Sequence, residues 1–136
     1  MDPQIRTLLN DLKTLVLSHP TVQDVHIRGE ESTATRGYLR MRLVLRSKDV
    51  VEVFVYLIGE GGVARLREYS LHWRQKDGAL IQRWDTAPHH PEMATFPSHT
   101  HRATGEVEPA VAFDWNGLIM CLQREVFASS HQKPDA

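Results

Sequence analysis

The chain has 136 residues, of which 41% are hydrophobic and 24% charged, and its formal net charge is −1. A chain of this length is expected to form one domain that buries roughly two-thirds of the surface its unfolded form exposes, so it needs no stabilising disulfide. Its single cysteine excludes a disulfide framework, and the near-neutral charge argues against the broad basic surface of a non-specific nucleic-acid binder.

The sequence shows no signal for a membrane span or for secretion. No stretch approaches the ~18 consecutive apolar residues of a membrane helix, and the first residues lack a basic region followed by an apolar core. We therefore expect a cytoplasmic protein with no membrane segment.

Arginine dominates the basic residues, since 12 of the 16 lysines and arginines are arginine. Residues 28–102 hold 12 of these basic residues against 9 acidic ones. Guanidinium groups suit planar, bidentate contact with phosphate or carboxylate, so the pattern is compatible with a local basic face. It is equally compatible with arginine stems that cover a sheet and keep their charged ends in water.

An amphipathic helix is predicted near the N-terminus. Asp2 and Pro3 are typical of the cap and the first position of a helix, and His19-Pro20 should end it. The apolar residues between them recur at helical spacing, namely Ile5, Leu8, Leu9, Leu12, Leu15 and Val16.

Three strands are predicted next, over residues 22–28, 38–46 and 50–58. The first two alternate between apolar and polar residues, and the polar residues 29–35 are expected to form the loop between them. The third is apolar on both faces except at Glu52, which indicates the central strand of a sheet.

A fourth strand, over residues 63–75, changes the phase of its alternation part-way along. Leu66 is out of phase with Trp73, so the two halves of the strand would bury opposite faces. A β-bulge or bend near Arg67 or Glu68 is predicted to reconcile them.

Asp77-Gly78 is a strong hairpin signal, because a two-residue type I′ turn needs residues that tolerate positive φ. Such a turn pairs Ser70 with Asp85, His72 with Arg83, and Arg74 with Ile81. One face of the hairpin then carries the apolar residues Leu71, Trp73, Leu80 and Trp84, and the other carries Ser70, His72, Arg74, Arg83 and Asp85.

The C-terminal part is predicted to end in a helix. Residues 102–109 are polar and are expected to be irregular. Asp114 is expected to cap a helix with Cys121 as a buried thiol and with Leu118, Ile119, Leu122 and Val126 as its buried stripe. Residues 129–136 are expected to fray, which leaves residues 1–128 as the domain.

These elements predict a single α+β domain. We expect an antiparallel meander of about five strands, with the N- and C-terminal helices packed on one face of the sheet.

Five of the eight histidines lie between residues 69 and 101. The proline-rich residues 88–101 leave the polar face at Asp85, and a span of four residues reaches at most ~14 Å. We expect this loop to fold back over the polar face, so that His89 or His90, and His99 or His101, approach His72, Arg83 and Asp85.

One hypothesis for this face is metal-independent RNA cleavage. Histidine exchanges protons near neutral pH, and arginine stabilises a charged phosphate. The candidate catalytic residues are His72, Arg83, Asp85, His89, His90, His99 and His101. The candidate substrate-binding residues are Arg74 for phosphate and Trp84 or Phe96 for a stacked base, with a core role open for both aromatic residues.

Two alternatives remain open from the residues. His99 and His101 form a His-x-His pair which, with Asp85, is a workable ligand set for zinc or another divalent transition metal, whereas acid–base cleavage needs no cofactor. Alternatively, the protein is not an enzyme, and the doubly apolar strand of residues 50–58 builds a homodimer or a groove for a blocked target.

Three short segments carry a family resemblance: HWR at residues 72–74, RWDTAPHHPE at 83–92 and TFPSHTH at 95–101. Together they resemble the TumE-like family, the toxin component of a class of bacterial toxin–antitoxin modules. The resemblance implies a small cytoplasmic toxin that cleaves RNA and is neutralised by a DNA-binding helix-turn-helix antitoxin. It assigns no catalytic residue.

Overall fold

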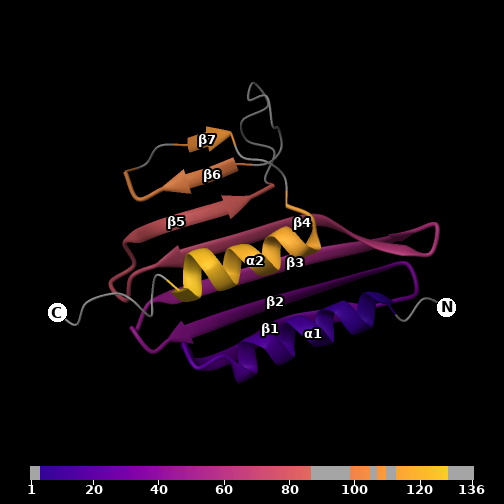
Figure 1. Ribbon diagram of the computed structural model, residues 1–136, viewed down its shortest axis with the longest axis horizontal. Helices are drawn as coiled ribbons and strands as arrows, with labels where there is room; N and C mark the ends of the chain where they lie inside the picture. The colour runs from indigo at the N-terminus through magenta and orange to yellow at the C-terminus, as the bar shows by residue number, and fades with distance from the viewer. Residues whose placement is uncertain (1–3, 87–98, 105–106, 110–112, 129–136) are drawn as a thin grey trace.

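The computed structural model describes residues 4–86, 99–104, 107–109 and 113–128, with the backbone alone for 99–102 and 107–109. Within these ranges the chain forms one antiparallel sheet of seven strands in sequence order (Figure 1). The strands are β1 (Val22–Ser32), β2 (Arg36–Leu45), β3 (Val50–Glu60), β4 (Val63–Arg74), β5 (Leu80–Asp85), β6 (His99–Arg102) and β7 (Val107–Pro109). The helices are α1 (Gln4–Ser18) and α2 (Trp115–Cys121), which continues as the π-helix η1 (Leu122–Phe127).

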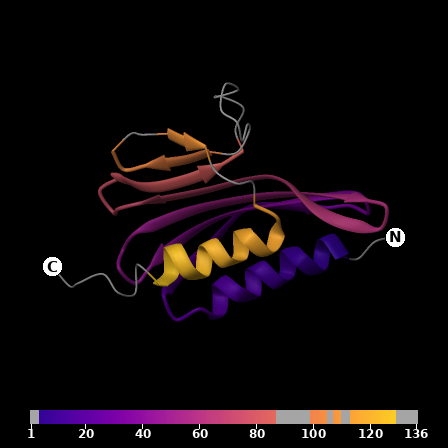
Figure 2. The same ribbon diagram turned by 45° about the horizontal axis from the view of Figure 1, so that its top comes forward.

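The predicted fold class is confirmed. Both helices lie on the same side of the sheet, α1 over β1 and β2 and α2 beside it toward β4 (Figures 1 and 2). Strand β3 is internal, paired with β2 on one side and β4 on the other. No helix in the described ranges is long and apolar enough to cross a membrane.

Two short strands extend the sheet beyond the five that were expected. Residues 102–109, predicted to be irregular, contribute the end of β6 and all of β7. Strand β6 pairs along the edge of β5, and β7 pairs with β6. Strand pairing satisfies backbone donors and acceptors whatever the side chains are. A polar stretch can therefore form a strand without the alternation of apolar and polar residues that would predict one from the sequence.

The core lies between the helices and one face of the sheet. Helix α1 ends at Ser18, before His19-Pro20, as predicted, while its Asp2-Pro3 cap lies outside the described residues. Its fully buried residues are Ile5, Leu9, Leu12 and Val16. They join one cluster with the inward residues of the central strands, among them Leu39, Met41, Leu43, Val51, Val53, Val55 and Leu57.

The predicted bulge in β4 is confirmed at Arg67. Tyr56 of β3 pairs with Glu68, whereas the next residue, Leu57, pairs with Leu66, so that Arg67 is the extra residue. Before the bulge Ala64 and Leu66 pack against the core, and after it the buried residues are Tyr69, Leu71 and Trp73. The bulge therefore lets one strand bury both of its apolar phases on the same face.

The β4–β5 turn differs from the prediction. The Gly78 N–H donates to the Gln75 carbonyl at 2.9 Å, and the Gln75 N–H donates to the Ala79 carbonyl at 2.8 Å. Gly78 has a φ of 96°. The loop therefore comprises residues 76–78, the three-residue type that ends in a left-handed glycine, and the two-residue type I′ turn is wrong.

A register shift after the turn restores the predicted pairing near the polar face. Arg74 pairs with Leu80, and the next ladder position pairs Trp73 with Gln82, so Ile81 is the extra residue. Ile81 rather than Leu80 packs against the core. Beyond this shift the predicted pairs His72–Arg83 and Ser70–Asp85 are confirmed.

The C-terminal helix begins as predicted. The Asp114 carboxylate accepts a hydrogen bond from the Gly117 N–H at 2.7 Å, which caps α2. Leu118, Leu122 and Val126 are fully buried and Ile119 packs beside them. The tail of residues 129–136 lies outside the described residues.

Cys121 is buried, as expected from its helical pattern. Burial, and secondarily the nearby Glu125 carboxylate, raise the pKa of the Cys121 thiol from 9.0 to about 12. The thiol is therefore protonated at neutral pH and is a packing group rather than a nucleophile.

The contact between α1 and the sheet predicts a sharp difference between two glycines. A Cβ at Gly37 would stand 2.7 Å from Ile5 Cγ2 and 3.1 Å from the Glu31 carbonyl oxygen, whereas a Cβ at Gly59 meets nothing closer than 3.7 Å. Gly37→Ala should lower the unfolding free energy by about 1–3 kcal/mol because α1 must shift. Gly59→Ala, the matched control, should lower it by less than about 0.5 kcal/mol; urea denaturation that gives equal losses would contradict this packing.

The thiol predicts a pH effect of known sign. Its folded pKa lies above the unfolded value, so its contribution to stability is complete below pH 9.0 and is lost as pH rises toward about 12. Between pH 9.0 and about 12, the unfolding free energy of the parent should therefore fall relative to that of Cys121→Ala. In a second measurement, iodoacetamide at pH 8 should label the thiol of the parent only after denaturation. Rapid labelling of the folded protein would show that the thiol is accessible.

Candidate functional site

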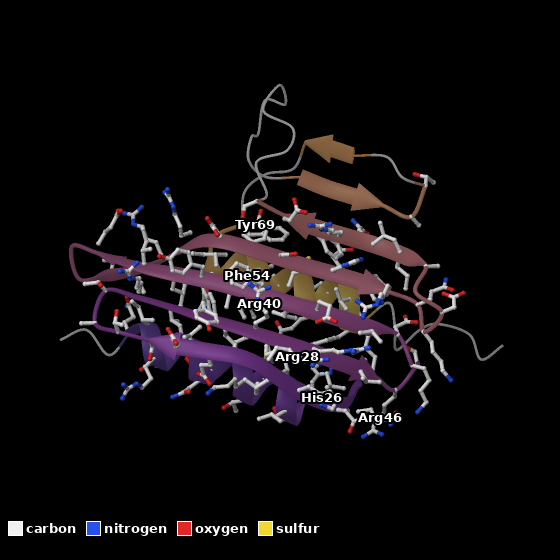
Figure 3. The ribbon with its side chains drawn as sticks, turned by 180° about the vertical axis from the view of Figure 1, so that it is seen from behind. His26, Arg28, Arg40, Arg46, Phe54 and Tyr69 are labelled. Atoms are coloured by element: carbon white, nitrogen blue, oxygen red, sulfur yellow. The ribbon has the colours of Figure 1, made fainter. Side chains whose placement is uncertain are left out.

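The face of the sheet opposite the helices is polar and carries the candidate site; we call it the open face. Two adjacent cross-strand rows define it. The first runs through His26, Arg42, Glu52, His72 and Arg83, and the second through Arg40, Phe54, Ser70 and Asp85. Figure 3 shows this face, with Arg40 and Phe54 near its middle and His26 and Arg28 toward β1.

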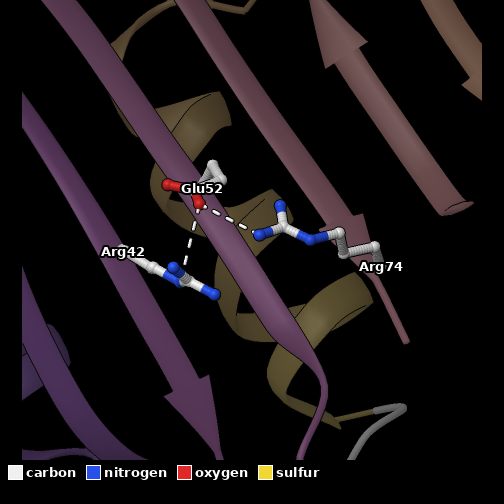
Figure 4. A network of polar contacts seen from close by, with 3 residues as sticks. All are labelled: Arg42, Glu52 and Arg74. Carbon is white, nitrogen blue, oxygen red and sulfur yellow. Dashed lines mark hydrogen bonds and ion pairs between the residues drawn. The ribbon is translucent and has the colours of Figure 1, made fainter. Parts of the chain in front are cut away.

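Glu52 joins three strands on the open face. Its Oε1 lies 3.2 Å from Arg74 Nη2 on β4 and 3.7 Å from Arg42 Nε on β2 (Figure 4). The three side chains are 22–36% exposed, so each pair is screened by water and contributes at most about 1 kcal/mol. The trio carries one net positive charge, which keeps this end of the face basic.

Arg83 and Asp85 form a closer pair on β5. Arg83 Nε lies 2.7 Å from Asp85 Oδ2, and the Asp85 side chain is 1% exposed while that of Arg83 is 38% exposed. A buried carboxylate requires a partner, because its charge has been removed from water. The contact is an ion pair without hydrogen-bond geometry, so it holds the guanidinium near the carboxylate while the Arg83 side chain stays partly exposed.

Two shallow depressions meet at Arg83. One, of about 290 Å³, is lined by Arg40, Glu52, Val53, Phe54, Ser70, His72 and Arg83. The other, of about 260 Å³, is lined by Phe54, Glu68, Tyr69, Ser70, Arg83, Asp85 and Thr86. Phe54, Ser70 and Arg83 border both, so the two depressions together form one continuous hollow over β3, β4 and β5.

The structure brings together three of the predicted site residues and separates two others from them. His72, Arg83 and Asp85 adjoin one another at this hollow. Arg74 lies on the same face but is bonded to Glu52. Trp84 is 6% exposed and belongs to the core cluster. Its predicted role as a stacking surface is therefore wrong, and the alternative role in the core is confirmed.

The remaining candidates fall on β6 or outside the described residues. The backbone of His99 pairs with Asp85, and that of His101 pairs with Arg83, so both histidine positions adjoin the site in the ladder. His89, His90 and Phe96, with the loop that was expected to fold over the open face, lie outside the described residues. Among the residues that are described, no three His, Cys, Asp or Glu side chains gather as a metal site would require.

Phe54 and Arg40 border the hollow but were not among the predicted site residues. The Arg40 guanidinium carbon lies 4.3 Å from the centroid of the Phe54 ring. The signal was present, since Arg40 belongs to the polar phase of its strand and Phe54 to the outward phase of a strand that is apolar on both faces. Only the pairing of Arg40 with Phe54, and of Phe54 with Ser70, shows that they share a surface with His72.

Comparison with known proteins identifies the family. The family model described as Toxin TumE matches residues 12–126, which is most of the chain. The chain belongs to the TumE toxin family. No match was found among curated proteins or solved structures.

As a TumE-family toxin the protein is one component of a toxin–antitoxin module and has an antitoxin partner. The resemblance seen in the three short segments is thus confirmed over a much longer span.

The Arg83–Asp85 contact predicts a stability effect. Arg83→Ala should lower the unfolding free energy by about 1–3 kcal/mol, because it removes the cation beside a buried carboxylate. Asp85→Asn removes the negative charge that Arg83 compensates. The double variant Arg83→Ala/Asp85→Asn should therefore lose less unfolding free energy than the two single variants lose when their losses are added. Denaturant unfolding of all four proteins measures this coupling, and additive losses would show that the pair is not coupled.

Proposed function

We propose that this TumE-family toxin is a metal-independent ribonuclease whose reaction takes place in the hollow over β3, β4 and β5. The observation that carries the proposal is the juxtaposition of His72, Arg83 and Asp85 at that hollow. A proton carrier and an exposed guanidinium are two of the groups that RNA cleavage uses, and the carboxylate holds the guanidinium beside it.

The proposed reaction is an internal transesterification. A base removes the proton of the ribose 2′-OH, the 2′-oxygen bonds to the adjacent phosphorus, and the bond from phosphorus to the 5′-oxygen breaks. An acid gives a proton to the departing 5′-oxygen. The products are a 2′,3′-cyclic phosphate and a free 5′-OH, with no redox change and no co-reactant.

In this scheme His72 is one proton carrier and Arg83 stabilises the negative charge on the phosphate. Asp85 is a positioning residue, because its contact at 2.7 Å keeps the guanidinium close. The second proton carrier is one of His89, His90, His99 and His101, of which His99 and His101 have positions opposite Asp85 and Arg83 in the sheet. Arg74 and Phe96 are proposed to contact the substrate beyond the reacting phosphate.

The antitoxin is proposed to be a DNA-binding helix-turn-helix protein that neutralises the toxin. A partner that covers the hollow over β3, β4 and β5 would exclude RNA from it.

The test is cleavage of single-stranded RNA by the purified toxin, in EDTA and after addition of zinc. Cleavage that survives EDTA and yields cyclic phosphate ends supports the proposal. Cleavage that EDTA abolishes and zinc restores would favour instead a metal site built on His99, His101 and Asp85. Absence of cleavage under every condition would favour a toxin that blocks its target without chemistry.

His72→Gln should reduce the cleavage rate by roughly 10²- to 10⁴-fold, the usual contribution of one acid–base group. His26→Gln is the matched control, because His26 lies in the same cross-strand row but on β1, beyond Arg42 and Glu52. The control should cleave at the parental rate and arrest growth when expressed without antitoxin. Equal activity of the two variants would remove His72 from the reaction.

A further inference from the structure

Phe54 is an aromatic side chain on the open face of an internal strand. Its neighbours on that strand, Val53 and Val55, are buried in the core, whereas Phe54 is half-buried and borders both depressions of the hollow. Among the described residues, Phe54 is not part of the core cluster and is not packed against it. The Phe54 ring instead gives the open face a flat apolar surface, surrounded by the polar or basic residues Arg40, Ser70 and Arg83.

The Phe54 ring has two kinds of neighbour. Arg40 lies over the ring at 4.3 Å and also borders the depression on the His72 side. The second depression is bordered by Phe54 together with Tyr69, Ser70 and Thr86. The ring thus borders a cationic group and a hollow of about 260 Å³.

The second depression offers hydrogen-bonding groups beside the ring. Glu68 is exposed there, Ser70 is half-buried, and Arg83 closes the side toward His72. Carboxylate and hydroxyl oxygens accept hydrogen bonds from exocyclic amino groups, whereas two carboxylates, Glu68 and Asp85, would repel a phosphate. The depression therefore fits the base of a nucleotide, and the arginine side of the ring fits its phosphate.

We propose that Phe54 is the stacking platform of a nucleobase-binding subsite for single-stranded RNA. The base lies in the depression bordered by Tyr69 and Ser70 and stacks on Phe54, and Arg40 polarises the ring. Aromatic side chains on an exposed sheet face bind unpaired bases in this manner, with arginines along the backbone. The subsite places the adjoining phosphate next to Arg83. This inference rests on the proposed ribonuclease function and assigns the residue that holds the substrate base.

The test measures binding apart from cleavage. The probe is a fluorescent hexamer of 2′-O-methyl ribonucleotides, which lacks the attacking hydroxyl, at one fixed salt concentration. Phe54→Leu keeps an apolar side chain of similar size but removes the aromatic face, and it should weaken binding roughly 5- to 150-fold. A second probe with the same phosphates and no bases should bind the parent and Phe54→Leu equally.

Tyr56→Leu is the matched control, because Tyr56 is half-buried two residues along the same face of β3 and borders a different depression, with Glu31, Thr33 and Tyr38. It should bind the hexamer as the parent does, and thermal denaturation should show that both variants remain folded. The inference is overturned if Phe54→Leu binds like the parent, if both variants weaken binding equally, or if the parent does not prefer the base-bearing probe. Cleavage measured separately on RNA decides the proposed function, so a toxin that cleaves RNA but fails these binding tests loses only the stacking subsite.

Discussion

Both helices pack on one face of a single sheet, and the chemistry of the other face depends on that constraint. Side chains of a regular strand alternate between its two faces, so covering one face with α1 and α2 leaves every second residue of β2 and β3 on the open face. The inward set is a continuous apolar cluster. In the described part of the chain the outward set lies outside that cluster, and it places arginine, histidine and one phenylalanine over neighbouring strands (Figure 3).

Two extra residues keep that division intact along β4 and β5. The bulge at Arg67 brings Ala64 and Leu66 onto the same face as Leu71 and Trp73. The shift at Ile81 compensates for a loop one residue longer than a type I′ turn, and it returns His72 to its position opposite Arg83. Without the second shift, Arg83 would move to the helix-covered face, because a displacement of one residue inverts a strand. The site therefore depends on irregular positions as much as on the regular ladder.

The Arg83–Asp85 pair gives the open face a fixed point. Most charges there are exposed and weakly held, as in the Arg42–Glu52–Arg74 network (Figure 4). Asp85 differs because it is almost fully buried while Arg83 is not. A buried carboxylate keeps a nearby cation close, and an arginine held close in advance loses less entropy when it binds an anion. Phe54 and Arg40 border the same hollow as Arg83.

The sequence by itself determined the class of fold, the order of its main elements and the bulge near Arg67, because alternation and capping residues are local signals. The pairs His72–Arg83 and Ser70–Asp85 were predicted from a two-residue turn that is wrong, and they hold because the shift at Ile81 compensates for the longer loop. It also carried the family resemblance that the match over residues 12–126 confirms. Tertiary structure alone decided the three-residue loop, the strands β6 and β7, the burial of Asp85 and the place of Trp84 in the core. It alone brought Phe54 and Arg40 to the hollow beside His72. These features arise from contacts between residues distant in the chain, and a strand's own sequence does not specify which neighbour will lie beside each outward residue.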